Sequence, residues 1–247
     1  MICLGDLHGN FQHLIYTLSK GSLDNTNVIQ VGDFGIGFLT AEKDIHNLHI
    51  INEALKIHNC KLYILRGNHD DPSYFKGDLK NNLNDELSNI VLIEDYEVHE
   101  IEGENVFFVG GGISIDRKVR TLNKSYWKDE AVKLNGKKMN EIKKKYKGKK
   151  IDIIITHSAP MWCNPKGIND PIVRDWCSND LELSKDLIEE REDLATIFDE
   201  MNEEFKFKFH IYGHFHKSYG EKIVDCQHIV LGIGKFFNLN KYKENLK

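Results

Sequence analysis

The sequence predicts an α/β fold, in which helices pack against sheets of largely buried strands. In the first 70 residues, short apolar runs alternate with segments whose apolar residues recur at helical spacing. This alternation calls for a sheet covered by helices. Between residues 90 and 109, three short apolar runs bounded by turn residues follow one another closely, which indicates additional, antiparallel strands. The 247 residues show no internal repeat, no low-complexity linker and no clear domain boundary, so we expect a single domain over residues 1–247.

The first part of the chain contains three predicted strands and two predicted helices. The strands are the apolar runs at residues 2–4, 28–31 and 61–65. The first helix covers residues 11–20, with Leu14, Ile15 and Leu18 on one face and Asn10 placed to cap its start. The second covers residues 41–58, where apolar residues again fall at helical spacing.

The later elements are shorter and more varied. Further strands are predicted at residues 90–93, 96–101, 106–109, 151–155, 207–212, 222–224 and 228–231. Residues 133–150 hold nine lysines against one glutamate, which predicts a solvated helix and linker. Residues 158–180 carry three of the four prolines and predict a long loop or lid, followed by a helix over 181–204.

Composition excludes several classes of protein. The formal net charge of −5 argues against a general nucleic-acid coat and against attraction to anionic membranes, and nothing indicates readout of base sequence. No apolar stretch approaches the ~20 residues of a membrane span, and the start of the chain lacks the features of a signal peptide. The five cysteines are scattered without a Cys-x-x-Cys pair, as in a reduced compartment. We therefore expect a cytoplasmic protein.

Five predicted strands end in polar side chains of kinds that bind metals. Four of these ends place a glycine directly before the first such residue. In sheets crossed by helices, ligands bind beyond the carboxyl ends of the strands, and neighbouring strands lie about 4.8 Å apart. We therefore expect these side chains to converge: Asp6, His8, Asp33, Asn68, His69, His157, His214 and His216.

The converging donors are carboxylate, imidazole and carboxamide groups, with no thiolate among them. This mixture suits Mn²⁺, Fe, Zn²⁺ or Ni²⁺ better than Ca²⁺ or a structural zinc site of the cysteine type. The seven histidines outside these strand ends are expected to be structural or solvated: His13, His46, His49, His58, His99, His210 and His228.

Taken in chain order, these residues resemble the signature of the calcineurin-like metallophosphoesterase family. The matching segments are Asp6-Leu7-His8, Gly32-Asp33, Gly67-Asn68-His69-Asp70, His157 and Gly213-His214-Phe215-His216. The resemblance implies one divalent ion held by Asp6, His8, Asp33 and His216. It implies a second held by Asp33, Asn68, His157 and His214, with Asp33 as the bridge. Mn²⁺ is the expected ion, with Fe, Zn²⁺ and Ni²⁺ as alternatives.

The resemblance also implies a fold and a reaction. The fold would be an α/β/β/α sandwich of two mixed sheets flanked by helices. The reaction would be hydrolysis of a phosphodiester or phosphomonoester, with nucleotides among the candidate substrates, by in-line attack of a metal-activated hydroxide. Two ions about 3.5–4 Å apart suit such a displacement. His69 would protonate the departing oxygen as a general acid.

Two other functions stay open at this stage. Protein serine/threonine phosphatases share Gly5-Asp6-x-His8-Gly9 and Leu65-Arg66-Gly67-Asn68-His69, but here Ile36 and Gly37 stand where that branch has an Asp and an Arg. His216 resembles the phosphodiesterase-type branch more closely. A non-catalytic metal-binding scaffold would be expected to lack ligands, whereas all seven are present.

The substrate would be a small-molecule or nucleotide phosphate ester, and its binding requires positive charge. Arg117, Arg120 and Arg66 are the candidates, because an arginine can grip phosphate through two nitrogens. Trp127, Trp162 and Trp176 either pack in the core and loops or stack on a base. The sequence does not indicate an oligomeric state.

Overall fold

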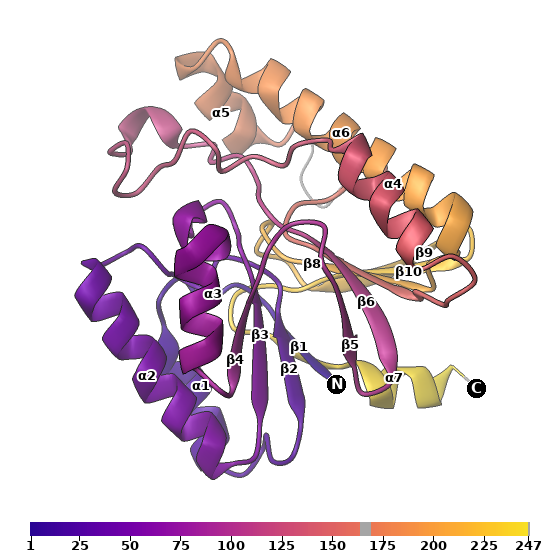
Figure 1. Cartoon of the computed structure of the whole chain (residues 1–247). Coiled ribbons are helices and arrows are strands. Elements are labelled where there is room, and N and C mark those ends of the chain that lie inside the picture. The colour runs from indigo at the N-terminus through magenta and orange to yellow at the C-terminus, as the bar shows by residue number, and fades with distance from the viewer. Residues whose placement is uncertain (164–168, 247) are drawn as a thin grey trace.

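Two β-sheets pack face to face, and helices cover both outer faces of the pair (Figure 1). This arrangement is seen in a computed structural model that describes residues 1–163 and 169–246. Both sheets contain parallel and antiparallel pairs. The expected α/β/β/α sandwich of two mixed sheets is therefore confirmed.

The first sheet has the strand order β11-β1-β2-β3-β4. Its strands are β1 (Ile2–Leu4), β2 (Asn27–Gln30), β3 (Lys61–Leu65), β4 (Ile90–Ile93) and β11 (Phe236–Asn238). Strands β1 to β4 run parallel, and β11 is antiparallel to β1. The expectation that residues 90–93 pair with antiparallel neighbours was wrong, because β4 extends the first sheet alongside β3.

Three helices cover the outer face of the first sheet: α1 (Phe11–Ser19), α2 (Ala41–Ile57) and α3 (Gly77–Glu86). A short 3-10 turn, η1 (Pro72–Phe75), precedes α3. Helix α1 buries Leu14 and Leu18 as expected, but the Asn10 side chain makes no capping hydrogen bond, so its capping role was wrong. Helix α3 was not predicted because most of its residues are polar.

The second sheet has the strand order β5-β6-β7-β8-β10-β9. Its strands are β5 (Val98–Ile101), β6 (Glu104–Val109), β7 (Ile153–Thr156), β8 (Phe209–Tyr212), β9 (Tyr219–Ile223) and β10 (Cys226–Val230). The four inner strands are parallel, and antiparallel β5 and β9 form the two edges. Most of the predicted strands in this half are present with shifted ends.

Helices α4 (Gly136–Lys145) and α6 (Leu183–Phe205) cover the outer face of the second sheet. The predicted lysine-rich helix is α4, which buries Met139 and Ile142. A short 3-10 turn, η2 (Arg117–Val119), and helix α5 (Pro171–Asn179) lie in the connections. The segment expected to be a loop thus contains a helix, whose start is marked by Pro171 and by Asp170 accepting from the Ile172 amide. Residues 164–168 of that segment lie outside the described residues.

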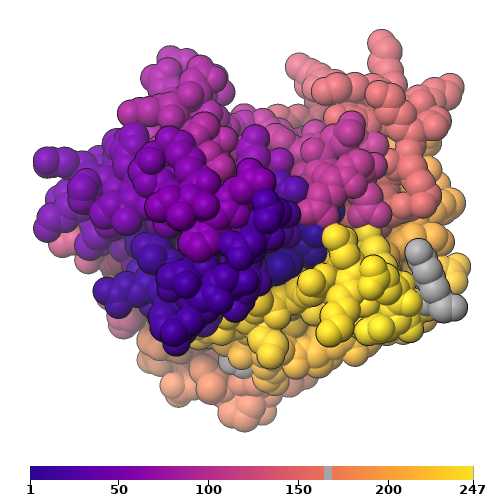
Figure 2. All heavy atoms as spheres, turned by 90° about the horizontal axis from the view of Figure 1, so that it is seen from below, coloured from indigo at the N-terminus to yellow at the C-terminus, as the bar shows by residue number. Residues whose placement is uncertain are grey.

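The interior between the sheets is filled by apolar side chains from both, such as Ile29 and Leu65 from the first and Phe108 and Ile155 from the second. The chain ends in α7 (Leu239–Asn245), which follows β11. Figure 2 shows this C-terminal segment beside the N-terminal residues, as the pairing of β11 with β1 requires. None of the described helices combines the length and apolar character needed to cross a membrane.

Candidate metal centre

The candidate site lies beyond the carboxyl ends of five strands, three from the first sheet and two from the second. β1 leads to Asp6 and His8, β2 to Asp33, β3 to Asn68 and His69, β7 to His157, and β8 to His214 and His216. β1, β2 and β3 are adjacent in one sheet, and β7 and β8 are adjacent in the other. The structure therefore brings together all eight residues that the sequence singled out.

One cluster of ligand atoms consists of Asp6, His8 and His216, whose donor atoms lie within 4.8 Å of one another. The Nε2 atoms of His8 and His216 face each other at 3.0 Å. Nε2 of His216 lies 3.4 Å from Oδ2 of Asp6, and Nε2 of His8 lies 3.9 Å from the same oxygen. Two imidazole nitrogens and a carboxylate oxygen thus point at one small volume, as ligands of a cation do.

A second cluster is formed by Asp33, Asn68, His157 and His214. Oδ1 of Asn68 lies 3.0 Å from Nε2 of His157 and 2.9 Å from Nδ1 of His214. The other ring nitrogen of His157, Nδ1, lies 2.9 Å from the carbonyl of Val31, to which it donates. A histidine that binds a metal commonly donates its other N–H to an oxygen in this way.

The carboxylate of Asp33 stands between the two clusters. Its Oδ1 lies 3.3 Å from Nε2 of His157, and its Oδ2 lies 3.8 Å from Nε2 of His8. Oδ1 also accepts a hydrogen bond of 2.9 Å from the backbone N–H of His69. The Asp33 carboxylate therefore directs one oxygen toward each of the two ligand clusters.

Four of the clustered residues have left-handed backbone conformations. The φ angles are +47° for His8, +56° for Asp33, +66° for His214 and +54° for His216. Such a conformation costs a non-glycine residue about 1 kcal/mol or more, and it concentrates where a side chain must be aimed at a site. Of the eleven described non-glycine residues with a positive φ, these four are predicted ligands.

Three of the four glycines that directly precede a ligand make room for a ligand that follows another strand, whereas Gly5 faces the carbonyl of Gly232. A Cβ on Gly67 would overlap the Asp33 carboxylate, and a Cβ on Gly213 would overlap that of Asp6. This close approach gives the recurring glycine of the sequence pattern a physical reason.

The charged groups of the site influence one another's pKa values. Burial by itself raises the pKa of Asp33, but the charges of His157 and His69 outweigh it and hold that pKa well below the usual range. Burial lowers the pKa of His157, yet Asp33 raises it to about 9. Burial raises the pKa of Asp6 to about 7 and lowers that of His214 well below its ordinary value. A bound cation would replace the proton on His157, so the donor set fits a metal.

Asp70 belongs to the Gly67–Asp70 motif but received no role from the sequence. It is fully buried, and its carboxylate accepts hydrogen bonds from the amides of Phe34, Gly35, Ile36 and Gly67. Burial, together with the charge of Asp33, raises the pKa of Asp70 to about 6. Asp70 thereby ties the loop after β2 to the loop after β3. The sequence did offer one signal for a role of Asp70, namely its position directly after Asn68-His69.

His69 is positioned by a second group of residues at the rim of the site. Nη2 of Arg120 lies 3.5 Å from Nε2 of His69, and Nε of Arg120 donates to Asp116 at 2.5 Å. Burial lowers the pKa of His69 to about 4, although Asp33 acts to raise it. Asp116 was missed by sequence reasoning because nothing in its local sequence marks it.

The three candidate phosphate-binding arginines lie in different surroundings. Arg66 is buried, pairs with Asp95 at 2.7 Å and donates to the carbonyl of Glu130. Arg117 pairs with both Asp180 and Asp186. Neither Arg66 nor Arg117 lines the pocket beside the metal clusters, so their positions do not support a phosphate-binding role, whereas Arg120 lines that pocket. Arg120 alone of the three reaches His69.

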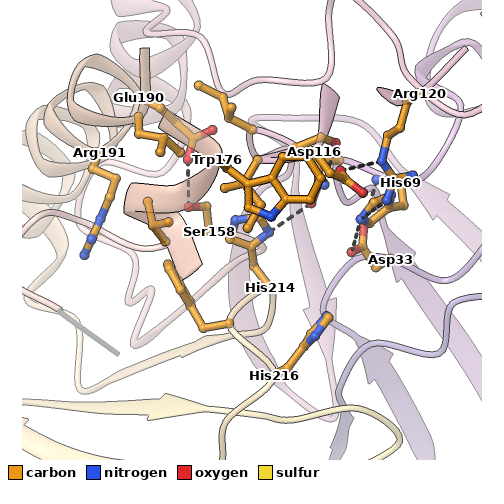
Figure 3. Close-up of a pocket in the computed structure, with 17 residues that line it drawn as sticks. Asp33, His69, Asp116, Arg120, Ser158, Trp176, Glu190, Arg191, His214 and His216 are labelled. Atoms are coloured by element: carbon orange, nitrogen blue, oxygen red, sulfur yellow. Dashed lines mark hydrogen bonds and ion pairs between the residues drawn. The ribbon is translucent and has the colours of Figure 1, made fainter. Parts of the chain in front are cut away.

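A pocket of about 260 Å³ opens beside the metal clusters. Figure 3 shows Arg120, His69 and Asp33 on one side and Glu190 and Arg191 on the other, with the indole of Trp176 between them in this view. The apolar wall of the pocket includes Ile113, Val173, Trp176 and Leu187. Trp127 and Trp162 instead pack elsewhere, Trp162 against Phe198.

Fold and site together define a metal-binding phosphoesterase. The sequence profile of the calcineurin-like phosphoesterases matches residues 1–218, and the chain belongs to this family. It is a hydrolase that acts on phosphoester bonds. No curated protein sequence matches the chain.

Solved structures with the same fold are distant in sequence. TT1561 of Thermus thermophilus is 12% identical, with 94% of this chain and 89% of that chain covered and a TM-score of 0.57. The phosphopantetheinyl hydrolase PptH of Mycobacterium tuberculosis is 14% identical over 100% of this chain and 92% of that chain, with a TM-score of 0.47. The first of these likenesses supports the fold, and neither indicates a substrate.

Proposed function

We propose that this chain hydrolyses small phosphate esters with two divalent ions bridged by Asp33. One ion would be held by Asp6, His8, Asp33 and His216, and the other by Asp33, Asn68, His157 and His214. The observation that carries the proposal is the Asp33 carboxylate, which faces His157 with one oxygen and His8 with the other. Nitrogen and oxygen donors of this kind suit Mn²⁺, with Fe, Zn²⁺ or Ni²⁺ as alternatives.

When bound, such ions would neutralise charge on the phosphoryl oxygens and lower the pKa of a water that attacks phosphorus. Side chains of the protein would perform the two remaining tasks, which are phosphate binding and proton transfer to the departing oxygen. Arg120 would bind a phosphate oxygen, because its guanidinium is held beside the site by Asp116. The negative charge of a bound phosphate would favour the protonated form of His69, which would then donate its proton to the departing oxygen.

The pocket favours a small ester with an apolar or aromatic portion. Its wall beyond Arg120 is formed by Ile113, Val173, Trp176 and Leu187. A nucleotide could place its base against Trp176, since aromatic rings stack in this way. A phosphodiester and a phosphomonoester would both fit the metal clusters.

A protein serine/threonine phosphatase is the second candidate, and the structure gives it less support. The position expected to hold an acid beside the catalytic histidine is Ile36, which is buried in the apolar cluster under α1 and α2. Asp116 and Arg120 surround His69 instead. An arginine is likewise lacking at Gly37.

The test compares hydrolysis of bis-p-nitrophenyl phosphate and p-nitrophenyl phosphate, with Mn²⁺ added and after chelation. Mn²⁺-dependent cleavage of the diester would support the phosphodiesterase-type reaction, and a preference for the monoester would support the phosphatase reaction. No turnover of either ester with two metals bound would contradict the proposal and favour a binding scaffold.

Variants separate metal binding from proton transfer. Asp33→Ala should lose bound metal and activity together, because both ions share this carboxylate. His69→Asn should keep its metal while kcat falls by roughly 10²–10⁴-fold, the usual contribution of a general acid. His49→Asn changes a partly exposed histidine on α2 and is the matched control. Full activity in Asp33→Ala would overturn the proposed centre.

A further inference from the structure

A second group of metal-binding side chains lies on the outer face of the second sheet. Cys163, His210 and His228 are buried, and their donor atoms lie within 4.8 Å of one another. His210 on β8 and His228 on β10 are direct neighbours in the parallel pairing. Cys163 reaches them from the loop after β7. None of the three belongs to the phosphoesterase site.

The three donor atoms converge closely. Nδ1 of His228 lies 3.0 Å from Nδ1 of His210 and 3.2 Å from Sγ of Cys163. Zinc bonds of about 2.0 Å to nitrogen and 2.3 Å to sulfur separate tetrahedral ligand atoms by about 3.3–3.6 Å. Outward movements of a few tenths of an ångström would therefore admit an ion.

Hydrogen bonding fixes which nitrogen of His210 carries the proton. The Thr156 hydroxyl donates to the carbonyl of Ser158, so its oxygen accepts from Nε2 of His210 at 2.8 Å. Nδ1 of His210 then keeps its lone pair, directed at His228. A neutral imidazole that donates its other N–H to an oxygen is the form that binds metals.

A candidate fourth ligand, outside this group of three, lies on the edge strand β9. Glu221 stands directly opposite His228 in the antiparallel pairing, so both side chains lie on one face of the sheet. Its Oε1 is buried and has no hydrogen-bond partner within the described part of the chain. The buried Oε1 of Glu221 thus lies on the same face of the sheet as His228, with no hydrogen-bond donor of its own among the described residues.

The surrounding residues hold this group in place. Arg191 on α6 donates to the carbonyls of Ala159, Pro160 and Cys163, which fixes the loop that carries the cysteine. The Phe198 ring, also on α6, packs 5.6 Å from the ring of His210 and 5.5 Å from that of His228. The donor atoms are therefore pre-positioned between α6 and the sheet.

We propose that Cys163, His210 and His228, with Glu221 as fourth ligand, form a closed structural site for one zinc ion. Zinc suits a set of one sulfur, two imidazoles and a carboxylate, and four protein ligands leave no position for a substrate. Binding would release the thiol proton to water and shift the proton of His228 from Nδ1 to Nε2, with no redox change. The site would clamp the loop after β7 to β8 and β10, and the proposal does not depend on phosphoesterase activity.

Cobalt is the probe, because the residues proposed for the phosphoesterase site contain no sulfur. A thiolate-to-cobalt charge-transfer absorption can then arise only from a cysteine site. We expect the chelator-stripped protein to develop this absorption as Co²⁺ is added, with the amplitude of one thiolate–cobalt bond per chain, and to lose it when Zn²⁺ displaces the cobalt. Cys163→Ser should abolish the absorption. Cys60→Ser, at a buried cysteine in the apolar cluster of the first sheet, should retain it.

Asp33→Asn separates the two sites. It should lose Mn²⁺ while keeping the cobalt–thiolate absorption and a zinc-dependent rise in Tm that Cys163→Ser lacks. Circular dichroism of Cys163→Ser checks that the variant is folded. The proposal is overturned if saturating Co²⁺ produces no charge-transfer band in the folded wild type, or if the band survives in Cys163→Ser. The first result would identify the cluster as a neutral hydrogen-bonded group, and the second would assign the cobalt to another cysteine.

Discussion

The guanidinium of Arg120 approaches His69 from the side of the pocket, with Nη2 of the arginine 3.5 Å from Nε2 of the histidine. An arginine can only donate hydrogen bonds, so Nε2 of His69 presents its lone pair in this arrangement. Asp116 and the carbonyl of Ser125 hold the guanidinium from behind. A phosphate oxygen entering the pocket would compete with His69 for Arg120 and free the imidazole to act on the substrate.

Arg120→Ala should therefore lower kcat/KM for phosphate esters by about 10²-fold, a typical loss when one group that stabilises transition-state charge is removed. Metal content should not change, because Arg120 is not among the proposed ligands. Arg174→Ala removes the same charge from an exposed position on α5 and is the control. Equal activities of the two variants would rule out a role for Arg120 at the phosphate.

Gly67→Ala should disturb the site without unfolding the protein. The added Cβ would overlap the carboxylate and backbone nitrogen of Asp33, which would have to move. A displacement of about 1 Å in a catalytic group can cost roughly 10²-fold in rate, so we expect a loss of that order together with weaker metal binding. Gly136→Ala at the start of α4 meets no atom within 4 Å and should be neutral. The measurements are kcat and bound metal, and unchanged metal affinity in Gly67→Ala would contradict the placement of Asp33.

Asp70→Asn should destabilise the protein even in the absence of metal. Each carboxylate oxygen of Asp70 accepts two backbone N–H groups, and an amide would turn its own N–H₂ toward two of those donors. Buried donors left without acceptors cost about 1–3 kcal/mol each, so we expect a loss of roughly 2–4 kcal/mol in the free energy of unfolding. Urea denaturation of the chelated protein measures it. Asp71→Asn, which changes only the cap of η1, should cost about 1 kcal/mol or less.

The sequence predicted the strands that carry the site better than the elements around them. The run at residues 61–65 matches β3 at both ends, and β1 likewise agrees. Buried parallel strands are nearly continuous apolar runs, which makes them visible in a sequence. β11 and α7 were missed because β11 is defined by its pairing with β1 more than 230 residues away, which no local pattern reveals.

Within the site, too, features that follow from local sequence were predictable, whereas contacts between residues far apart in the chain were not. The metal-binding residue types follow directly after strands, so their convergence could be inferred from topology. The roles of the arginines could not, because Arg66 pairs with Asp95 and Arg117 with Asp180, partners that lie 29 and 63 residues further along the chain. His210 and His228 were expected to be structural or solvated for a similar reason, since the pairing of β8 with β10 is what brings them together.

Away from the site, Glu97 should give the protein a stability that disappears in acid. Burial by itself raises the pKa of Glu97, but hydrogen bonds with His99 and Lys80 outweigh it and bring that pKa to about 2, below the ordinary value of 4.5. A carboxylate with a lowered pKa in the folded state stabilises the protein fully above pH 4.5. It loses this effect as the pH falls toward 2.

Glu97→Gln should therefore be less stable than wild type at pH 6, and the difference should shrink between pH 4.5 and 2. Other carboxylates titrate in both proteins, so the difference in urea midpoint isolates Glu97. Glu100→Gln, at an exposed position of the adjoining strand β5, controls for the change in net charge. A wild-type advantage over Glu97→Gln that stays constant down to pH 2 would show that the ion pairs with Lys80 and His99 do not stabilise the fold.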